Sequence, residues 1–252
     1  MIRAIMHGCN GKMGSVITTL CEDDAEISIV AGVALNLEPA RSYPVYTNIA
    51  QVQEEADVII DFSGATAVDA LLDYVEEKKV PVVLCTTGLS EAQLRRVEEV
   101  STSVAVLRSA NMSLGINTLM DLLKKATQVF ANAGYDVEIV EKHHNQKLDA
   151  PSGTALALAD VINEEMDGAY EYVYDRSQVR QKRDKKELGI SAVRGGTIVG
   201  EHEIIFAGLD EVITFQHTAY SKSIFAKGAV SAAKFLAGKS AGMYDMADVI
   251  RG

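Results

Sequence analysis

The chain has 252 residues, of which 48% are hydrophobic and 23% charged, a composition typical of a globular protein with one large or two smaller domains. Its formal net charge of −11 argues against nucleic acid as a partner, because phosphates repel an acidic surface. With no apolar run long enough to cross a bilayer, no cleavable signal pattern and three cysteines without metal-ligand spacing, we expect a cytoplasmic protein with free thiols, no metal and no membrane partner.

The chain begins with a short apolar run at residues 2–6, which predicts a buried strand, and a glycine-rich turn and an apolar helix through Cys21 follow it. Such a corner binds phosphates in dinucleotide folds, because small residues let the backbone approach a pyrophosphate at the helix N-terminus. The glycines Gly8, Gly11 and Gly14 have the spacing G-x-x-G-x-x-G rather than the commoner G-x-G-x-x-G. By itself this spacing is also compatible with an ordinary turn.

Short β-branched runs alternate with helical stretches through the rest of the first half. The runs are 57–62, 80–84 and 104–107, and the helices are 65–79 and 91–100. Ser90 and Gln93 have the spacing of a capping box at the start of the second helix. The alternation predicts a doubly wound parallel sheet, with ligands at the carboxyl ends of its strands. Polar turns at 61–64, 85–88 and 109–112 should converge there.

The end of the expected second strand, residues 27–33, bears on the choice of nicotinamide cofactor. An NAD-preferring site usually places an acid there to bind the ribose 2′-hydroxyl, but this chain has Asn36. Lys12 and Arg41 are nearby cations, which favours a 2′-phosphate. We therefore predict NADPH preference or dual use of NADPH and NADH, although Glu38 would reverse the preference if the turn were one residue longer.

The second half of the chain has a different pattern. Helical periodicity covers residues 113–133 and ends at Gly134. A strand at 135–141 and a helix through about Glu165 follow, and further strand-like runs occur at 169–174, 190–193, 200–206 and 212–219. Consecutive strands indicate an open mixed sheet, so we place a domain boundary near Asn111. An Ala-rich helix at 224–236 could return to cover the first sheet.

A basic run between Arg176 and Lys186 has two interpretations. We favour a solvated loop over a nucleic-acid arm, because one short run on an acidic chain is a small electrostatic footprint. Arg194-Gly195-Gly196 and His202 lie beside expected strands, and one interpretation is that they have a structural role. A zinc site is not expected, because His143, His144, His202 and His217 lack the spacing of known zinc motifs.

Residues 138–154 carry the densest group of reactive side chains. In order they are His143, His144, Lys147, Asp149 and a Pro-Ser-Gly-Thr turn that opens onto a helix. Imidazole titrates near neutral pH and can donate a proton, while the backbone N–H groups of Gly153 and Thr154 at a helix start would bind an anion. The pattern predicts a site that protonates a small anionic substrate. The alternative is a structural histidine beside a simple helix start.

Residues 141–156, E-K-H-H-N-Q-K-L-D-A-P-S-G-T-A-L, closely resemble the E-x-H-H-x-x-K-x-D-A-P-S-G-T-A signature of the dihydrodipicolinate reductase family, also called 4-hydroxy-tetrahydrodipicolinate reductase. The chain shows other landmarks that resemble those of this family, in the same order: Gly11-Lys12-Met13-Gly14, Thr86-Thr87-Gly88, Ala110-Asn111-Met112-Ser113, and Arg194-Gly195-Gly196 with Gly200-Glu201-His202. The resemblance covers essentially the whole chain, and its histidine signature is highly specific.

The resemblance implies an α/β fold with two domains. Residues 1–111 and 223–252 would form a Rossmann-type dinucleotide-binding domain, completed by the C-terminal helix. Residues 112–222 would form an α+β domain with an open mixed sheet, which binds substrate and builds a homotetramer. The implied reaction is the NAD(P)H-dependent reduction of 4-hydroxy-tetrahydrodipicolinate (dihydrodipicolinate) to tetrahydrodipicolinate, in the diaminopimelate route of lysine biosynthesis.

Site residues follow from the same resemblance, motif by motif. His143 is implied to be the general acid and Lys147 the second proton donor, and the small cyclic dicarboxylate substrate would contact His144, Gly153 and Thr154. The implied cofactor contacts are Gly8, Cys9, Asn10, Gly11, Lys12, Met13, Cys85, Thr86, Thr87, Ser109, Ala110, Asn111 and Met112. The chain departs from the family at Cys85, often glycine, at Met112, often phenylalanine, and at Asn36, an acid in members that use NADH well.

The chemistry of these residues fits the implied reaction independently. A ring that accepts hydride becomes anionic and needs a proton, which His143 can supply while Lys147 stabilises the developing charge. Two alternatives stay open. A homoserine or aspartate dehydrogenase-like reductase would share the build but gives no reason for the paired histidines. A non-catalytic NADP(H)-sensing protein would keep the fold and bind NADPH without oxidising it.

Overall fold

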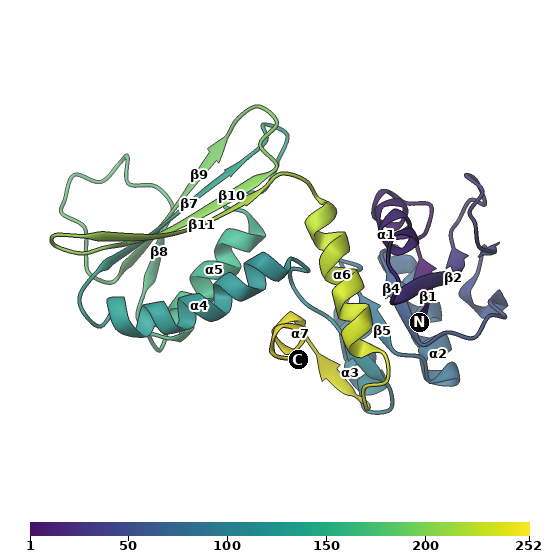
Figure 1. The fold of residues 1–252 in the computed structure, drawn as a ribbon. Coiled ribbons are helices and arrows are strands. Elements are labelled where there is room, and N and C mark those ends of the chain that lie inside the picture. Colours follow the sequence, from purple (N-terminus) through teal and green to yellow (C-terminus); the bar gives the residue numbers. More distant parts are fainter. The chain divides into compact units, whose positions relative to one another are not determined.

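The computed structural model describes residues 1–252, and the chain divides into two compact units (Figure 1). Unit 1 comprises Met1–Leu114 together with Ser223–Gly252, and unit 2 comprises Gly115–Lys222. The last thirty or so residues therefore return to the unit in which the chain began. None of the helices has the length and apolarity needed to span a membrane.

Unit 1 is built on a seven-stranded parallel sheet with the order β12-β6-β5-β4-β1-β2-β3. Its strands are β1 (Ile2–His7), β2 (Ile27–Val33), β3 (Val45–Tyr46), β4 (Val58–Asp61), β5 (Val82–Leu84), β6 (Ala105–Leu107) and β12 (Gly242–Tyr244). Strand β1 lies between β2 and β4, and the strand order reverses there, which creates a crevice at the carboxyl ends of the strands. The predicted doubly wound parallel sheet is confirmed.

Helices cover both faces of this sheet. They are α1 (Lys12–Glu22), α2 (Val68–Lys78), α3 (Glu91–Ser101), α6 (Ser223–Leu236) and α7 (Met246–Arg251), with short 3-10 turns at η1 (Ile49–Gln51) and η2 (Ala65–Ala67). Successive strand residues point to opposite faces, so Ile60 packs with α1 and α6 while Ile59 packs with α2 and α3. The C-terminal helix α6 thus lies on the same face as α1. The expected capping box at Ser90 and Gln93 is also present.

Unit 2 contains a five-stranded mixed sheet with the order β11-β10-β7-β9-β8. The strands are β7 (Asp136–His143), β8 (Glu171–Val173), β9 (Glu187–Arg194), β10 (Gly200–Ala207) and β11 (Val212–Ala219). Strands β7, β10 and β11 are antiparallel neighbours, whereas β7, β9 and β8 run parallel. Helices α4 (Leu114–Phe130) and α5 (Gly153–Glu164) cover one face (Figure 1). The expected open mixed sheet is confirmed.

The basic run at 176–186 is tied to this sheet by several ion pairs. Arg183 reaches Glu138 at 2.8 Å and Asp136 at 3.1 Å, and it also donates to the carbonyl of Val137. Lys185 reaches Asp136 at 3.2 Å, and Arg176 pairs with Glu187. Only part of this run is therefore a solvated loop, because Arg183 anchors it to β7.

Candidate functional site

The glycine turn after β1 packs its backbone against its neighbours more closely than a side chain would permit. Gly8 has φ +88°, and a Cβ there would lie 2.4 Å from the carbonyl oxygen of Phe62. A Cβ at Gly14 would lie 2.3 Å from the carbonyl oxygen of Gly8. The N–H groups of Gly8 and Cys9 both donate to Val33, at the end of β2. The turn is therefore built for close approach of a ligand to the start of α1, which an ordinary turn does not require.

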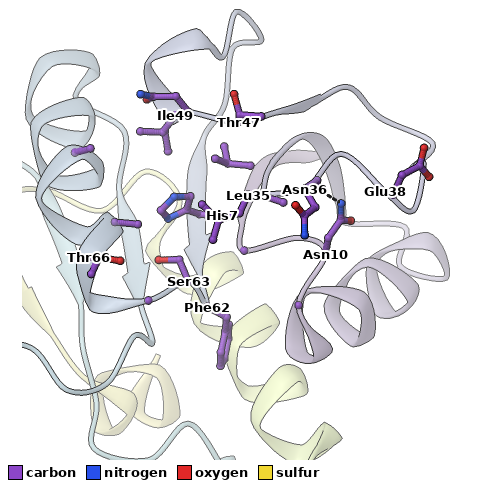
Figure 2. Close-up of a pocket in the computed structure, with 18 residues that line it drawn as sticks. His7, Asn10, Leu35, Asn36, Glu38, Thr47, Ile49, Phe62, Ser63 and Thr66 are labelled. Atoms are coloured by element: carbon purple, nitrogen blue, oxygen red, sulfur yellow. Dashed lines mark hydrogen bonds between the residues drawn. The ribbon is translucent and has the colours of Figure 1, made fainter.

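A cavity of about 500 Å³ opens at the carboxyl ends of β1, β2 and β4 (Figure 2). It lies where the strand order reverses, the usual position of a dinucleotide in such folds. Its lining combines polar and apolar side chains with exposed backbone: His7, Gly8, Asn10, Gly11, Val33, Ala34, Leu35, Asn36, Glu38, Thr47, Asn48, Ile49, Phe62, Ser63, Gly64, Thr66, Ala67 and Ala70. Three predicted cofactor residues, Gly8, Asn10 and Gly11, are thus brought to one cavity.

Residues after β2 surround the outer part of this cavity. Asn36 and Glu38 both line it, and the side-chain amide of Asn10 donates to the carbonyl of Asn36 at 2.7 Å (Figure 2). The Arg41 guanidinium donates to Asn10 Oδ1 at 2.8 Å and to Ser15 Oγ at 2.7 Å. Arg41 therefore braces the glycine turn, and an acid and a cation both lie near the end of β2.

A buried carboxylate joins three strands at the same edge of the sheet. Asp61, the last residue of β4, has no exposed surface. Its Oδ1 lies 2.7 Å from His7 Nδ1 and accepts from Ser63 Oγ at 2.6 Å, while its Oδ2 accepts from Thr86 Oγ1 at 2.6 Å. The turns at 61–64 and 85–88 are predicted from the sequence, but His7 and Asp61 are not. The signal that could have revealed Asp61 is a charged residue at the end of a wholly apolar strand.

Several predicted cofactor residues have side chains that face the protein interior. Cys9 is completely buried, with Sγ against Gly32. Thr86 is 6% exposed and is committed to Asp61. The Sγ of Cys85 points back toward the carbonyl of Val83, and burial raises the pKa of this thiol well above its ordinary value. These side chains support the turns, so any ligand contact at Cys9 or Thr86 falls to neighbouring groups or to the backbone.

The remaining predicted cofactor residues lie at the start of α1 and after β5 and β6. Lys12 and Met13 begin α1, whose N-cap Gly11 provides no side-chain cap for the first N–H groups. Ser109 Oγ donates to the carbonyl of Asn111 at 3.1 Å. Met112 is 5% exposed and packs in the core formed with α1 and α6. Thr87 and Ala110 lie in the turns after β5 and β6, between Thr86 and Gly88 and beside Ser109.

In unit 2, the segment that connects β7 to α5 carries the predicted catalytic and substrate-binding residues. His143 is the last residue of β7 and is 8% exposed, and His144 follows it. The Lys147 ammonium lies 2.9 Å from Asp149 Oδ1. This hydrogen bond, together with a smaller contribution from the Gly153 N–H, lowers the pKa of the Asp149 carboxyl. Gly153 begins α5, and Ser152 caps this helix, because its Oγ accepts the N–H of Ala155.

A fully buried carboxylate also holds His143. Glu141 has no exposed surface, and its Oε2 lies 2.6 Å from His143 Nδ1. Arg194, at the end of β9, donates to both carboxylate oxygens at 2.8 and 2.6 Å, and the Ser152 N–H donates at 2.9 Å. Burial raises the pKa of Glu141, but the hydrogen bonds from Arg194, His143 and Ser152 outweigh it, so the pKa lies below its ordinary value.

The sheet register assembles this cluster from distant parts of the chain. Arg194 is the partner of His143 in the parallel pairing of β7 and β9, and His202 is the partner of Glu141 in the antiparallel pairing of β7 and β10. His202 Nε2 lies 3.0 Å from Ser152 Oγ. Burial and the adjacent His143 lower the pKa of His202 to about 4, so this imidazole is neutral near physiological pH.

Arg194 and His202 belong to the motifs that resemble the family, and Glu141 is the first residue of the histidine signature, but the sequence gives none of the three a role at the site. An acid in the buried register of an alternating strand was the signal that could have found Glu141. In Asp136–His143 the buried positions are Val137, Ile139, Glu141 and His143. The Arg194-Gly195-Gly196 motif marks Arg194 in the sequence, but its contact with Glu141 arises only through pairing of β7 with β9.

Comparison with known proteins adds independent information. The family model for the N-terminus of dihydrodipicolinate reductase matches residues 2–112, and the model for its C-terminus matches residues 115–250. A 4-hydroxy-tetrahydrodipicolinate reductase from Caldanaerobacter subterraneus subsp. tengcongensis is 53% identical, over 100% of this chain and 99% of its own. The protein of the same name from Clostridium tetani is 48% identical, over 98% and 96%.

Solved structures share the fold at lower sequence identity. A dipicolinate-bound dihydrodipicolinate reductase from Paenisporosarcina sp. TG-14 has a TM-score of 0.79 and 24% identity, with 97% of each chain covered. An aspartate dehydrogenase from Thermotoga maritima has a TM-score of 0.53 and 12% identity, with 95% of this chain and 98% of that chain covered.

Proposed function

The chain belongs to the dihydrodipicolinate reductase family, and from that premise we propose that it reduces 4-hydroxy-tetrahydrodipicolinate (dihydrodipicolinate) to tetrahydrodipicolinate with NAD(P)H. The family resemblance noted in the sequence is confirmed over both halves of the chain. The observation that carries the proposal is the full-length match at 53% identity to a protein named for this reaction. The pathway would be the diaminopimelate route of lysine biosynthesis.

We assign the dinucleotide to residues 1–111 and 223–252. The residues present fit such a cofactor, because Gly8 and Gly14 allow close backbone approach and the cavity lies at the reversal of strand order. The N-terminus of α1 would bind the pyrophosphate with the N–H groups at Lys12 and Met13. A bound nicotinamide supplies the hydride. The remaining contacts would come from the turns after β5 and β6, residues 85–87 and 109–112.

The choice between NADPH and NADH would depend on the segment after β2. Glu38 lines the cavity and can accept from ribose hydroxyls, as an acid does in NAD sites. Arg41 lies beside Asn10, which itself bonds to Asn36, so a cation stands close enough to the same region to favour a 2′-phosphate. An acid and a cation together support dual use of the two cofactors, with NADPH preferred.

We assign the substrate to residues 112–222. His143 would deliver a proton to the ring as hydride arrives, and Lys147 would act as the second proton donor and stabilise the developing negative charge. The two substrate carboxylates would bind at His144 and at the start of α5, where Gly153 and Thr154 present backbone N–H groups to an anion. Lys147 also pairs with the Asp149 carboxylate, at 2.9 Å.

The same residues, 112–222, would build a homotetramer in the cytoplasm. This assignment follows from the family to which the chain belongs. Sedimentation at micromolar concentration measures the assembly directly. A monomer at that concentration would contradict this part of the proposal.

A coupled assay tests the reaction. The product of the preceding synthase is supplied fresh, and nicotinamide absorbance is followed with NADPH and with NADH. We expect turnover with both cofactors and a lower KM for NADPH. Binding of NADPH without its oxidation would instead support a sensing protein, and a strong preference for NADH would refute the cofactor assignment. Turnover of aspartate or homoserine in place of the cyclic substrate would favour a related dehydrogenase.

A further inference from the structure

Glu141 connects the predicted proton donor of unit 2 to the start of α5. We infer that Glu141 and Arg194 are positioning residues, which fix the ring nitrogen of His143 that exchanges a proton and hold it in register with the N-terminus of α5. The inference rests on the proposed function, which gives His143 its role as proton donor. The contacts of Glu141 and Arg194 described below do not depend on that role.

The position of Glu141 is costly for a fold to maintain. Strand β7 alternates buried and half-buried residues, and Glu141 occupies a buried position after Val137 and Ile139. An isolated carboxylate at such a position would be strongly destabilising, so it must be paired and hydrogen-bonded. Both oxygens are in fact saturated, by His143 and Arg194 on Oε2 and by Arg194 and Ser152 on Oε1. A carboxylate that receives four hydrogen bonds is ionised and has no freedom to rotate.

An ionised Glu141 determines the tautomer of His143. A carboxylate accepts only, so His143 Nδ1 must carry the hydrogen in the contact of 2.6 Å. Nε2 is then the nitrogen without hydrogen in the neutral ring, so it takes up the exchangeable proton when the ring becomes an imidazolium. Nε2 faces Gly200, where a Cβ would lie only 3.0 Å from it. Glycine at this position therefore leaves room beside the nitrogen that must meet substrate.

Arg194 has a separate electrostatic effect. A carboxylate alone beside His143 would strongly favour the imidazolium and would slow release of its proton to the substrate. The guanidinium binds the same two oxygens and compensates the carboxylate charge, so the imidazole can cycle between its two states. Arg194 also donates to the carbonyl of Asp149 at 2.7 Å, which fixes the segment that carries Lys147.

Glu141 reaches α5 through Ser152. The Ser152 N–H donates to Glu141, while its hydroxyl accepts the N–H of Ala155 and contacts His202. The residue that caps α5 is thus held by the carboxylate that orients His143. Loss of the Glu141 charge should therefore disturb both proton transfer and carboxylate binding, whereas loss of a simple structural contact would disturb only stability.

The test compares Glu141→Gln with Glu138→Gln. Glu138 lies on the same strand, and its carboxylate pairs with Arg183 outside this cluster. For Glu141→Gln we expect kcat to fall by roughly 10²-fold and the substrate KM to rise severalfold, with the dissociation constant for NADPH unchanged. Glu138→Gln should leave kcat and both constants near their wild-type values.

The pH profile distinguishes positioning from folding. The charged and titratable groups around His143 and Glu141 are Arg194 on β9, Lys147 and Asp149 on the connecting segment, and His202 on β10, which in turn contacts His217 on β11. Of the two variants, only Glu141→Gln removes the carboxylate that faces the His143 imidazolium. Since the general acid must be protonated, the alkaline decline of kcat should move to lower pH in Glu141→Gln and stay in place in Glu138→Gln.

The tautomer is measured independently of activity. Two-bond ¹H–¹⁵N correlations of the His143 ring should show hydrogen on Nδ1 in the wild type at neutral pH, and a mixture of tautomers in Glu141→Gln. Hydrogen on Nε2 in the neutral wild-type ring would overturn the inference, and so would Glu141→Gln with a wild-type kcat and pH profile. If Glu141→Gln does not fold, the kinetics of Arg194→Lys and the ¹H–¹⁵N spectrum of wild-type His143 serve as the test of positioning instead. An inactive wild type in the coupled assay would refute the proposed function, while the spectrum would still test the tautomer.

Discussion

Each unit of the molecule contains a fully buried carboxylate at a strand end, paired with a histidine. Asp61 lies 2.7 Å from His7 in unit 1, and Glu141 lies 2.6 Å from His143 in unit 2. The other partners differ. Asp61 is held by the neutral hydroxyls of Ser63 and Thr86, whereas Glu141 is held by the guanidinium of Arg194.

This difference separates two uses of one motif. Asp61 is bound by neutral hydroxyl donors and by His7, which forms a fixed network that joins β1, β4 and the turn after β5 beside the cavity. The Arg194 guanidinium compensates the charge of Glu141, so the adjacent imidazole gains and loses its proton beside a pair of zero net charge. The pairs look alike by distance, and their outer partners distinguish them.

The largest expected effect is on stability, at Asp61. Asp61→Asn replaces an acceptor oxygen by an amide N–H that faces donors, so we expect the free energy of unfolding to fall by about 3–5 kcal/mol, because two buried hydrogen bonds to one carboxylate are weakened together. Calorimetry of the whole chain measures it. Asp57→Asn is the control, because its partner Arg3 is 42% exposed and the loss should be below about 1 kcal/mol. Equal losses of unfolding free energy in the two variants would show that the buried Asp61 network stabilises the fold no more than the partly exposed pair of Asp57 and Arg3.

The second effect is a pH dependence at His202 in unit 2. The unfolded side chain has a pKa near 6.5 and the folded one a pKa of about 4, so the unfolded state binds the proton more tightly between these values. Stability should therefore fall as pH is lowered from 6.5 toward 4, by on the order of 3 kcal/mol. Denaturant unfolding at several pH values measures this slope. His202→Gln should flatten it, and an unchanged slope in that variant would contradict the assignment.

The third effect is on catalysis, and it contrasts the two histidines. His143→Gln should lower kcat by roughly 10²-fold or more, because the general acid is lost. His7→Gln should leave kcat nearly unchanged and weaken cofactor binding, because His7 lines the cavity and bonds to Asp61. Steady-state kinetics with each substrate varied gives both numbers. A near-wild-type kcat in His143→Gln would remove its proposed role.

The smallest effect concerns the cofactor. Arg41→Ala should raise the KM for NADPH by about tenfold, equivalent to about 1.4 kcal/mol, and change the KM for NADH less. The reason is that a 2′-phosphate gains from a guanidinium that a 2′-hydroxyl does not need. Arg41 also braces the glycine turn through Asn10 and Ser15. An equal rise for the two cofactors would therefore show that the bracing role is the only one.

Local patterns were sufficient for most of the fold. The strands β1, β4 and β5, the capping box at Ser90 and the open mixed sheet of unit 2 follow from residue periodicity and turn chemistry, which act over a few neighbours. The edge strands β3 and β12 were not predicted, because Val45–Tyr46 and Gly242–Tyr244 do not lie in longer runs of β-branched apolar residues. Strands this short form because a neighbouring strand is present to pair with, and nothing in their own residues indicates it.

The candidate site also has one part that local patterns predict and another that they do not. Residues 138–154 revealed His143, Lys147 and the start of α5, since these groups lie close together along the chain and their chemistry is legible there. The side chains of Cys9 and Thr86 point inward for reasons that lie outside their own segments. The backbone of the glycine turn that carries Cys9 is hydrogen-bonded to Val33, and the buried carboxylate of Asp61 needs Thr86 as a donor.

Arg194 reaches Glu141 from 53 residues away, and Thr86 reaches Asp61 from 25. Strand pairing and burial select such partners: the register of β7 with β9 and β10 brings Arg194 and His202 to one carboxylate. Composition and spacing alone therefore name the reactive groups of this protein. Their charge states and orientations arise only once buried carboxylates must find donors inside the folded sheets.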